Sequence, residues 1–245
     1  MNKTQTTKIL LYNSGYATGL DGSLKSYLLH FLRYIYTPKK VVRDVISSID
    51  SLVNIKKPDV CCLVEIRRVG KFIRRLWEYP FHEFANKYGS RSLRRHMPFF
   101  RKNSIGFFSD KYLPFHKHYL HCGAKKLIYE IALNHETSLI MGHLSLRKRT
   151  RRKQLCEIKE MIGKRKHVIL CGDFNIFKGL SELEELIKDC GLRVVNTLND
   201  VTFPAVNPDR ALDLFLCSEG IRIESLEVLP VKASDHLPVL LEVQL

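Results

Sequence analysis

Short apolar runs of strand length recur along the whole chain, and turn residues separate them. Such runs are typical of buried β-strands when Gly, Pro, Asn or Asp bounds them. They predict strands at residues 8–12, 59–64, 104–109, 115–120, 127–133, 138–142, 168–171 and 238–243. Several of these runs are apolar at every position, as expected for strands that are covered on both faces.

A second pattern, with apolar residues three and four positions apart, predicts helices between some of the strands. The clearest helix covers residues 41–53, and another follows the basic run at 147–153 and presents an apolar face over residues 155–162. A third begins at a capping box formed by Ser181 and Glu184 and ends at Gly191. Strands that alternate with helices in this way indicate a mixed α/β protein.

Three basic segments, two of them rich in aromatic residues, each allow two interpretations. Residues 27–36 predict a short buried helix, with a membrane-surface segment or a cover over a substrate cleft as the alternative. Residues 67–102 fit a nucleic-acid-binding surface, or equally a helix broken near Pro80 with aromatic residues in the core. The run at 147–153 is expected to be a solvated helix start, with a nucleic-acid contact as the alternative.

Polar side chains follow several of the predicted strands directly. They are Asn13, Glu65, His143, Asp173 and Asn175, with Asp235 and His236 immediately before the last strand and Asp213 within the apolar run ALDLFL. Functional groups collect at strand ends in mixed α/β sheets, so one shared cleft is expected. Carboxylates and amides that bind a hard cation, beside histidines that act on a proton or a phosphoryl oxygen, suit metal-assisted hydrolysis of a phosphate ester. A transition-metal site at His116, His118, His121 and Cys122 is the less favoured alternative.

Composition restricts the class of protein further. The 245 residues are 45% hydrophobic and show no linker or repeat, which predicts a single domain over 1–245. No apolar run reaches the length of a signal peptide or a transmembrane segment, so we expect a cytoplasmic protein with mostly buried, unpaired cysteines. The net charge of +15 indicates a polyanionic partner: nucleic acid, an anionic membrane surface or a phosphorylated substrate.

Six motifs in order resemble the endonuclease/exonuclease/phosphatase superfamily, whose fold is that of deoxyribonuclease I. The motifs are LLYN at 10–13, DVCCLVE at 59–65, GHLS at 142–145, LCGDFN at 170–175, RALDLFL at 210–216 and SDHLPV at 234–239. The resemblance spans nearly the whole chain. It implies a four-layered sandwich, with two β-sheets face to face and helices on the outer faces.

The same resemblance implies roles for individual residues. Glu65 would be the main ligand of Mg²⁺, or of Mn²⁺ in its place, helped by Asn13 and Asp235. His236, oriented by Asp213, and Asp173 would position or deprotonate the attacking water, and which of the two is the base stays open. Asn175 and His143 would hold the phosphate oxygens. We expect Ser145 and Arg210, which lie in two of the motifs, to contact the substrate.

Two departures restrict the branch of the superfamily. The abasic-site endonucleases have an aspartate and a glutamine where this chain has Gly15 and Val64, while His143 resembles the deoxyribonuclease, sphingomyelinase and inositol-phosphatase branches. We therefore predict a monomeric Mg²⁺-dependent phosphodiesterase with nucleic acid as the slightly preferred substrate. A phosphoesterase for phospholipid, sphingomyelin or inositol-phosphate headgroups, with peripheral membrane contact, is the first alternative. A non-catalytic basic scaffold that binds nucleic acid is the second.

Overall fold

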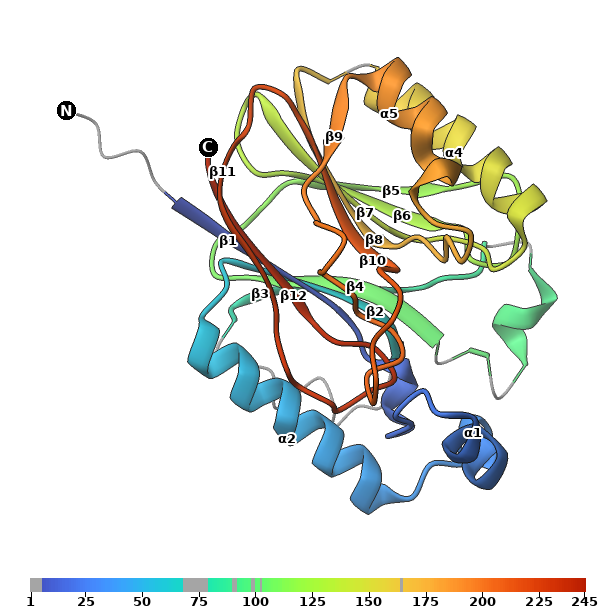
Figure 1. The fold of residues 1–245 in the computed structure, drawn as a ribbon. Coiled ribbons are helices and arrows are strands. Elements are labelled where there is room, and N and C mark those ends of the chain that lie inside the picture. Colours follow the sequence, from blue (N-terminus) through green and yellow to red (C-terminus); the bar gives the residue numbers. More distant parts are fainter. Residues whose placement is uncertain (1–5, 68–78, 90–91, 98–99, 102, 164) are drawn as a thin grey trace.

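Two β-sheets packed face to face form the centre of the protein in a computed structural model (Figure 1). The structure describes residues 6–67, 79–89, 92–97, 100–101, 103–163 and 165–245. Within them each sheet has six strands, and the strand orders are β11-β12-β1-β2-β4-β3 and β5-β6-β7-β8-β10-β9. Both sheets are mixed: β1 and β2 are parallel in the first, β7 and β8 are parallel in the second, and the other neighbours are antiparallel.

The strands of the first sheet are β1 (Thr6–Asn13), β2 (Val60–Arg67), β3 (Phe81–Asn86), β4 (Asn103–Ser109), β11 (Arg222–Val228) and β12 (Val239–Gln244). Those of the second sheet are β5 (Phe115–Tyr119), β6 (Leu127–Ala132), β7 (Thr137–His143), β8 (His167–Asp173), β9 (Leu192–Val194) and β10 (Asp213–Ser218). The α-helices are α1 (Leu24–His30), α2 (Lys39–Lys56), α4 (Lys148–Ile162) and α5 (Glu184–Cys190). Short 3₁₀ helices are η1 (Gly15–Ala17), η2 (Phe31–Tyr34), η3 (Leu93–His96) and η4 (Leu180–Leu183).

Helices cover the outer face of each sheet, which gives four layers (Figure 1). The apolar face of α2 packs on the first sheet through Val45, Ile49 and Val53, and α4 and α5 pack on the second sheet. A separate core fills the space between the sheets. A central strand such as β1 therefore sends Ile9 and Leu11 into one core and Leu10 into another, which is why its sequence is apolar at every position.

The eight predicted strands and the helices expected at 41–53, 155–162 and before Gly191 are confirmed, but four strands, β3, β9, β10 and β11, were not predicted. Strand β3 contradicts the broken helix that was the alternative around Pro80. Much of the segment at 67–102, including residues 68–78, lies outside the described residues. The capping box is also wrong, because Ser181 lies within η4 and α5 begins only at Glu184 without a side-chain cap. The helix does end at Gly191, whose φ of 57° is the left-handed conformation that glycine tolerates.

The prediction of a buried helix at residues 27–36 is wrong as well. The segment is helical, as α1 and η2, yet neither element contains a buried residue. Its large apolar side chains are exposed instead of buried.

A close approach between two glycines brings the ends of β7 and β8 together. Gly142 and Gly172 are partners in the parallel pairing of these strands, and the next pair is His143 with Asp173. A Cβ on Gly172, which has a φ of 151°, would lie 2.0 Å from the carbonyl oxygen of Gly142. The absence of a side chain at Gly172 is therefore what allows the two polar residues to emerge side by side.

We expect Gly172→Ala to lower the free energy of unfolding by about 3 kcal/mol or more, because a backbone clash adds to an unfavourable φ. Urea unfolding followed by circular dichroism measures the change. Gly163→Ala is the matched control, since the nearest atom to its Cβ would be 3.6 Å away. Equal stability of the two variants would contradict the close approach.

Candidate active site

Strand register brings the predicted site residues to one end of the two sheets. Asn13 ends β1 and lies beside Val64 of the parallel strand β2. In the facing sheet Asp173 ends β8, with His143 beside it on one side and Asp213 on the other. The carboxyl ends of β1, β2, β7 and β8 thus meet, which is where ligands bind in many α/β sheets.

A β-bulge directs Glu65 into this end of the molecule. The pairing of β2 with β4 shifts between Leu63 and Ile66, and Glu65 has a φ of 53°. Bulges next to active sites commonly re-aim a side chain in this way. Glu65 therefore lies within β2 rather than after its end, which the sequence did not indicate.

Asp173 is the centre of a hydrogen-bonded cluster that joins the two sheets. Its Oδ2 accepts a hydrogen bond from Asn13 Nδ2 at 3.0 Å and lies 3.1 Å from His143 Nε2. Its Oδ1 accepts from the backbone N–H of Asn175 at 3.0 Å. The chain turns at Asn175, where φ is 53°, and the Asn175 amide donates to the carbonyl of Leu144. Extended geometry therefore does not continue from Asp173 to Asn175.

The predicted pairing of Asp213 with His236 is present. His236 Nδ1 lies 2.6 Å from Asp213 Oδ2, which also accepts a hydrogen bond of 2.7 Å from the hydroxyl of Thr202. The ring of Phe203 covers the His236 imidazole at a centroid distance of 4.9 Å. A carboxylate on Nδ1 fixes the tautomer and leaves Nε2 free to act on a substrate atom. Thr202 and Phe203 had no signal in the sequence.

Asp235 lies on the same side as His236 and is tied to the N-terminal region. Its Oδ2 accepts a hydrogen bond of 2.6 Å from the hydroxyl of Tyr27 in α1, and its Oδ1 accepts one of 3.2 Å from Ser234. A Cβ at Gly15 would come within 2.8 Å of Asp235 Oδ1. Gly15 therefore makes room for the Asp235 carboxylate at the position where the abasic-site branch has an aspartate.

The buried Lys87 and the half-buried Lys125 both approach Glu65, and the sequence did not indicate either of them. The Nζ atoms of Lys87 and Lys125 lie 3.8 Å and 3.9 Å from Glu65 Oε1. Lys125 Nζ also contacts His143 Nε2, and Lys87 Nζ contacts the hydroxyl of Tyr16. Lysines are common in this basic chain and neither one follows an apolar run, so nothing marked these two. They place positive charge beside the carboxylate, as anionic substrates require.

Burial and neighbouring charges shift the pKa values of the site residues. Burial raises the pKa of Glu65 to about 7; Lys125 opposes this shift, whereas Asp235 and Asp173 add to it. Burial, together with Lys125, lowers the pKa of His143 to about 3, so its ring is neutral at pH 7. Burial alone would lower the pKa of His236, but Asp213 and Asp173 raise it to about 10. The site therefore holds a neutral and a cationic histidine side by side.

Asp173 is the carboxylate that ionises most readily in the site. Burial opposes its ionisation, but His143, His236 and Lys125 together lower the pKa of Asp173 well below its usual range. Its charge is therefore present at every pH at which the protein would be assayed.

The oxygen atoms of the site suit Mg²⁺, which keeps several water ligands, better than they suit a metal ion whose ligands are all side chains. Among the described residues, no group of three His, Cys, Asp or Glu side chains could hold a metal ion. Mg²⁺ needs only one or two carboxylates, because waters and substrate phosphate complete its shell. Glu65, with the amide oxygen of Asn13 and the carboxylate of Asp235, provides such a partial oxygen set. The raised pKa of Glu65 indicates a carboxylate whose negative charge a bound cation would stabilise.

The alternative transition-metal site is not formed. His118 Nε2 lies 2.9 Å from Glu130 Oε2, and His121 Nδ1 lies 2.8 Å from Glu157 Oε2. These histidines thus have separate carboxylate partners on the second sheet and on α4.

A basic groove of about 530 Å³ adjoins the cluster. Lys87 and Lys125, which approach Glu65, line this groove together with Tyr88. Ser145 and Arg147, which come just before α4, line it as well. Ser145 therefore lies where a substrate would pass, although its hydroxyl accepts a hydrogen bond from the backbone of Arg147. The groove provides a positively charged extension of the site.

Arg210, the other predicted contact, lies on the opposite flank near His236. Its guanidinium is 5.4 Å from the ring centroid of Phe177, which packs edge-on against Phe203. Arg210 is therefore joined to His236 through the rings of Phe177 and Phe203.

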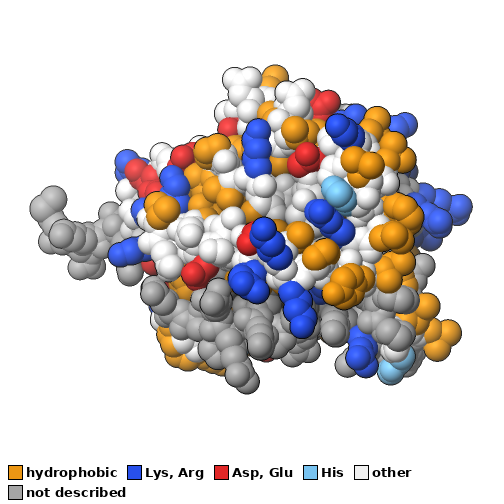
Figure 2. Space-filling view, turned by 90° about the horizontal axis from the view of Figure 1, so that it is seen from below, with side chains coloured by type: hydrophobic (Ala, Val, Ile, Leu, Met, Phe, Trp, Pro, Cys, Tyr) orange, Lys and Arg blue, Asp and Glu red, His pale blue; other side chains and the backbone are white. Residues whose placement is uncertain are grey.

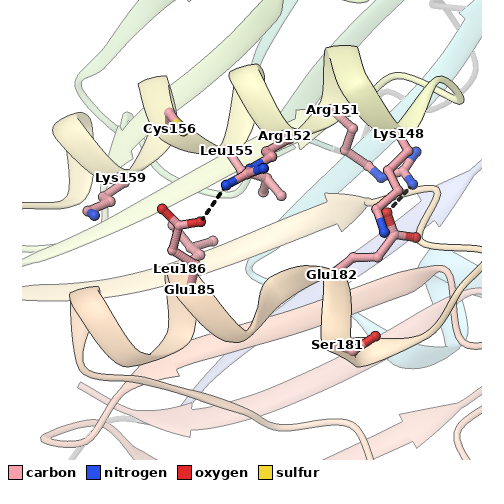
Figure 3. A pocket seen from close by; sticks show the side chains of 10 residues that line it. All are labelled: Lys148, Arg151, Arg152, Leu155, Cys156, Lys159, Ser181, Glu182, Glu185 and Leu186. Carbon is pink, nitrogen blue, oxygen red and sulfur yellow. Dashed lines mark hydrogen bonds and ion pairs between the residues drawn. The ribbon is translucent and has the colours of Figure 1, made fainter.

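A second pocket, of about 240 Å³, lies between α4 and α5 on the outer face of the second sheet (Figure 3). Its charged side chains pair with one another, Arg151 with Glu182 and Arg152 with Glu185. It contains none of the strand-end residues. The pocket is an interhelical contact, and the candidate active site is the cluster around Asp173.

Comparisons with known proteins agree with this geometry. Residues 143–236 match the model of the Endonuclease/Exonuclease/phosphatase family. An endonuclease/exonuclease/phosphatase family protein from Leptotrichia buccalis is 14% identical with a TM-score of 0.69, and covers 98% of this chain and 100% of its own. Humanized D. rerio TDP2 is 14% identical with a TM-score of 0.65, over 98% and 99% of the two chains. A mannosyl-6-phosphatase from Bacteroides thetaiotaomicron is 14% identical with a TM-score of 0.69, over 97% and 99%. No curated protein matches the sequence.

The matched segment contains His143, Asp173, Asn175, Asp213 and His236, and the fold of the whole chain is shared with the solved structures. Residues 143–236 are thus similar to the endonuclease/exonuclease/phosphatase family, and the whole chain has the fold of solved structures that carry this family name. Among the described residues no helix has the length and apolar character needed to cross a membrane.

Proposed function

We propose that the protein is a Mg²⁺-dependent phosphodiesterase whose preferred substrate is a nucleic acid. The observation that carries the proposal is the continuity between the strand-end cluster and the basic groove. Lys87 and Lys125 lie within 4 Å of Glu65 and also line the groove that leads to Arg147. A substrate with one phosphate at Glu65 and further phosphates along the groove would satisfy all of these positive charges.

The residues of the site divide the chemistry between them. Glu65, Asn13 and Asp235 would hold the metal ion, which supplies charge stabilisation at a phosphoryl oxygen when bound. Asp173, ionised and held by hydrogen bonds from the Asn13 amide and the Asn175 backbone N–H, would orient the attacking water and accept its proton. His236 is cationic at pH 7, so we assign it to donate a hydrogen bond or proton rather than to act as the base. Mn²⁺ would serve in place of Mg²⁺, since both take oxygen ligands.

His143 and Asn175 would contact the phosphoryl oxygens that gain charge in the transition state. His143 is neutral, and its Nδ1 has no hydrogen-bond partner although it is buried. The side-chain amide of Asn175 is held by the Leu144 carbonyl. The Lys125 side chain lies beside His143, so a transition state with more negative charge than the anionic ground state would be stabilised preferentially.

The experiment is hydrolysis by the purified protein of plasmid DNA, structured RNA, inositol phosphates and vesicles of sphingomyelin or phosphatidylinositol, with Mg²⁺ or with a chelator. We expect Mg²⁺-dependent cleavage of nucleic acid. Arg147→Ala should raise KM for nucleic acid on the order of fivefold and leave hydrolysis of a small soluble phosphodiester unchanged, because only a long substrate reaches Arg147. Binding should weaken on the order of tenfold between about 50 and 200 mM salt.

Arg222→Ala is the matched control for Arg147→Ala, since Arg222 is exposed at the start of β11, at the far end of the sheet from Asn13. Turnover of nucleic acid that does not change in Arg147→Ala would exclude the groove as the substrate path. Cleavage that continues in the presence of the chelator would show that the reaction does not require a metal ion.

A phosphoesterase for lipid or inositol-phosphate headgroups is the second candidate, because one observation favours it. The exposed apolar segment of α1 and η2 lies beside Asp235 through Tyr27. Turnover of headgroup substrates alone in the same panel would select this candidate over the nucleic-acid one.

A further inference from the structure

We infer that α1 and η2 form a surface that binds an anionic lipid membrane. The surface, called here the apolar ridge, consists of Leu24, Leu28, Leu29, Phe31, Leu32, Ile35 and Tyr36. The inference goes beyond the proposed function, because it concerns where the protein binds and is tested without turnover.

Exposure of the apolar ridge is unusual for side chains of this size. Leu24 is 83% exposed, Leu28 77% and Phe31 60%, and neither α1 nor η2 has a buried residue. Leu24 and Leu28 are four residues apart and so lie along one side of α1, and Leu32 follows in η2. Contiguous exposed apolar residues of this kind mark sites of contact with a partner or a membrane.

Polar contacts, rather than core packing, hold the apolar ridge in place. The hydroxyl of Ser23 caps α1, and Tyr27 donates its hydrogen bond to Asp235. The guanidinium of Arg67 donates to the carbonyls of Arg33 and Ile35. The polar side of the segment is therefore fixed to the protein, while the apolar side faces outward without a partner among the described residues.

Charge around the apolar ridge selects an anionic membrane as its occupant. Residues 22–43 include Lys25, Arg33, Lys39, Lys40 and Arg43 and contain no Asp or Glu. Figure 2 shows hydrophobic side chains beside lysine and arginine on the side of the molecule where α1 lies. Lysine and arginine near the surface of an anionic membrane each add to binding, and apolar side chains insert beside them.

Two other occupants fit these features less well. A second copy of the chain would bring another net charge of +15 against the first. Single-stranded nucleic acid would use aromatic rings as stacking platforms, but the apolar ridge is mostly leucine and isoleucine, which do not stack on bases. A membrane interior accepts these aliphatic side chains, and the aromatic residues suit its interface.

Membrane binding would also orient the active site. Tyr27 belongs to the same helix as the exposed leucines and contacts Asp235 directly. The strand-end cluster would therefore lie close to the lipid surface when the apolar ridge is bound.

The test is sedimentation of the full-length protein with vesicles of phosphatidylcholine alone, or of phosphatidylcholine mixed with phosphatidylglycerol, in the absence of Mg²⁺. We expect binding to the anionic vesicles and at least tenfold weaker binding to phosphatidylcholine alone. Leu28→Ser/Leu32→Ser should weaken binding to anionic vesicles by at least about tenfold. Lys39→Glu/Lys40→Glu should weaken it by a similar factor.

Matched controls have the same changes at exposed positions elsewhere. Ile55→Ser/Leu198→Ser and Lys166→Glu/Lys188→Glu should bind as the wild type does, and circular dichroism should show that all variants are folded. Failure of the wild type to bind anionic vesicles would overturn the inference, as would equal losses in the control variants. A dimer that depends on the apolar ridge, or ridge-dependent binding to RNA in place of vesicles, would overturn it too.

Discussion

Glu65→Ala is expected to reduce Mg²⁺-dependent hydrolysis by a factor on the order of 10³ or more, with the fold intact. The side chain provides the one carboxylate that both lysines approach, and its removal eliminates the main ligand of the metal ion and the charge that positions Lys87 and Lys125. Stability should not fall, because burial raises the pKa of Glu65 to about 7 and its ionised form is therefore costly to keep buried.

The measurements are kcat/KM on the preferred substrate and urea unfolding at pH 8. The unfolded-state pKa of a glutamate is about 4.3, so the cost of ionised Glu65 grows as the pH rises from there through 7. The variant should consequently gain stability relative to the wild type over that interval. Glu157→Ala, a carboxylate beside the exposed His121, is the control and should retain full activity. Hydrolysis that persists in Glu65→Ala would show that the metal site lies elsewhere.

Asp213→Asn should reduce kcat by about 10²–10⁴-fold, because the carboxylate that orients His236 and stabilises its charge is lost. The shape of the side chain is kept, so the backbone should not change. Without the carboxylate the pKa of His236 should fall from about 10. If His236 acts as a cation, the alkaline limb of the pH–rate profile should then move to lower pH.

Stability gives a second readout of the same ion pair. His236 has a folded-state pKa above its unfolded value of about 6.5, so the contribution of the pair is fully present below pH 6.5. It is lost as the pH rises through about 10. As the pH rises from 6.5 to about 10, the free energy of unfolding of the wild type should therefore fall more than that of Asp213→Asn. NMR titration of the His236 ring measures the pKa directly. Asp200→Asn, a change at a half-buried turn position whose carboxylate accepts hydrogen bonds from Thr197, is the control. An alkaline limb that is the same in both variants would contradict a cationic role for His236.

Much of the fold could be read from the sequence because burial on both faces leaves a local pattern. A strand such as β8 lies between another sheet and a helix layer, so its residues from Val168 to Cys171 are all apolar. Strands at the sheet edges have no such constraint. β11 has only half-buried and exposed positions and no continuous apolar run, and β9 has only three residues. The local pattern therefore did not indicate these two edge strands.

For the apolar ridge the local pattern predicted burial, whereas the structure shows exposure. Its apolar residues predict burial by their chemistry, and only the tertiary structure reveals that no other described element covers Leu28 or Phe31. The capping box failed for a related reason, since the hydroxyl of Ser181 is not used where a 3₁₀ turn precedes the helix.

By itself, the sequence determined which residue types end each strand and in what order. It therefore indicated the α/β fold and the grouping of Asp173, Asp213 and His236 in one site. Those residues follow or precede apolar runs, which is a local property. Only the tertiary structure decided that Glu65 enters the site through a bulge and that Lys125 stands between Glu65 and His143. Such contacts depend on strand register and on how the two sheets pack, and pairs so far apart in the chain leave no trace in its local pattern.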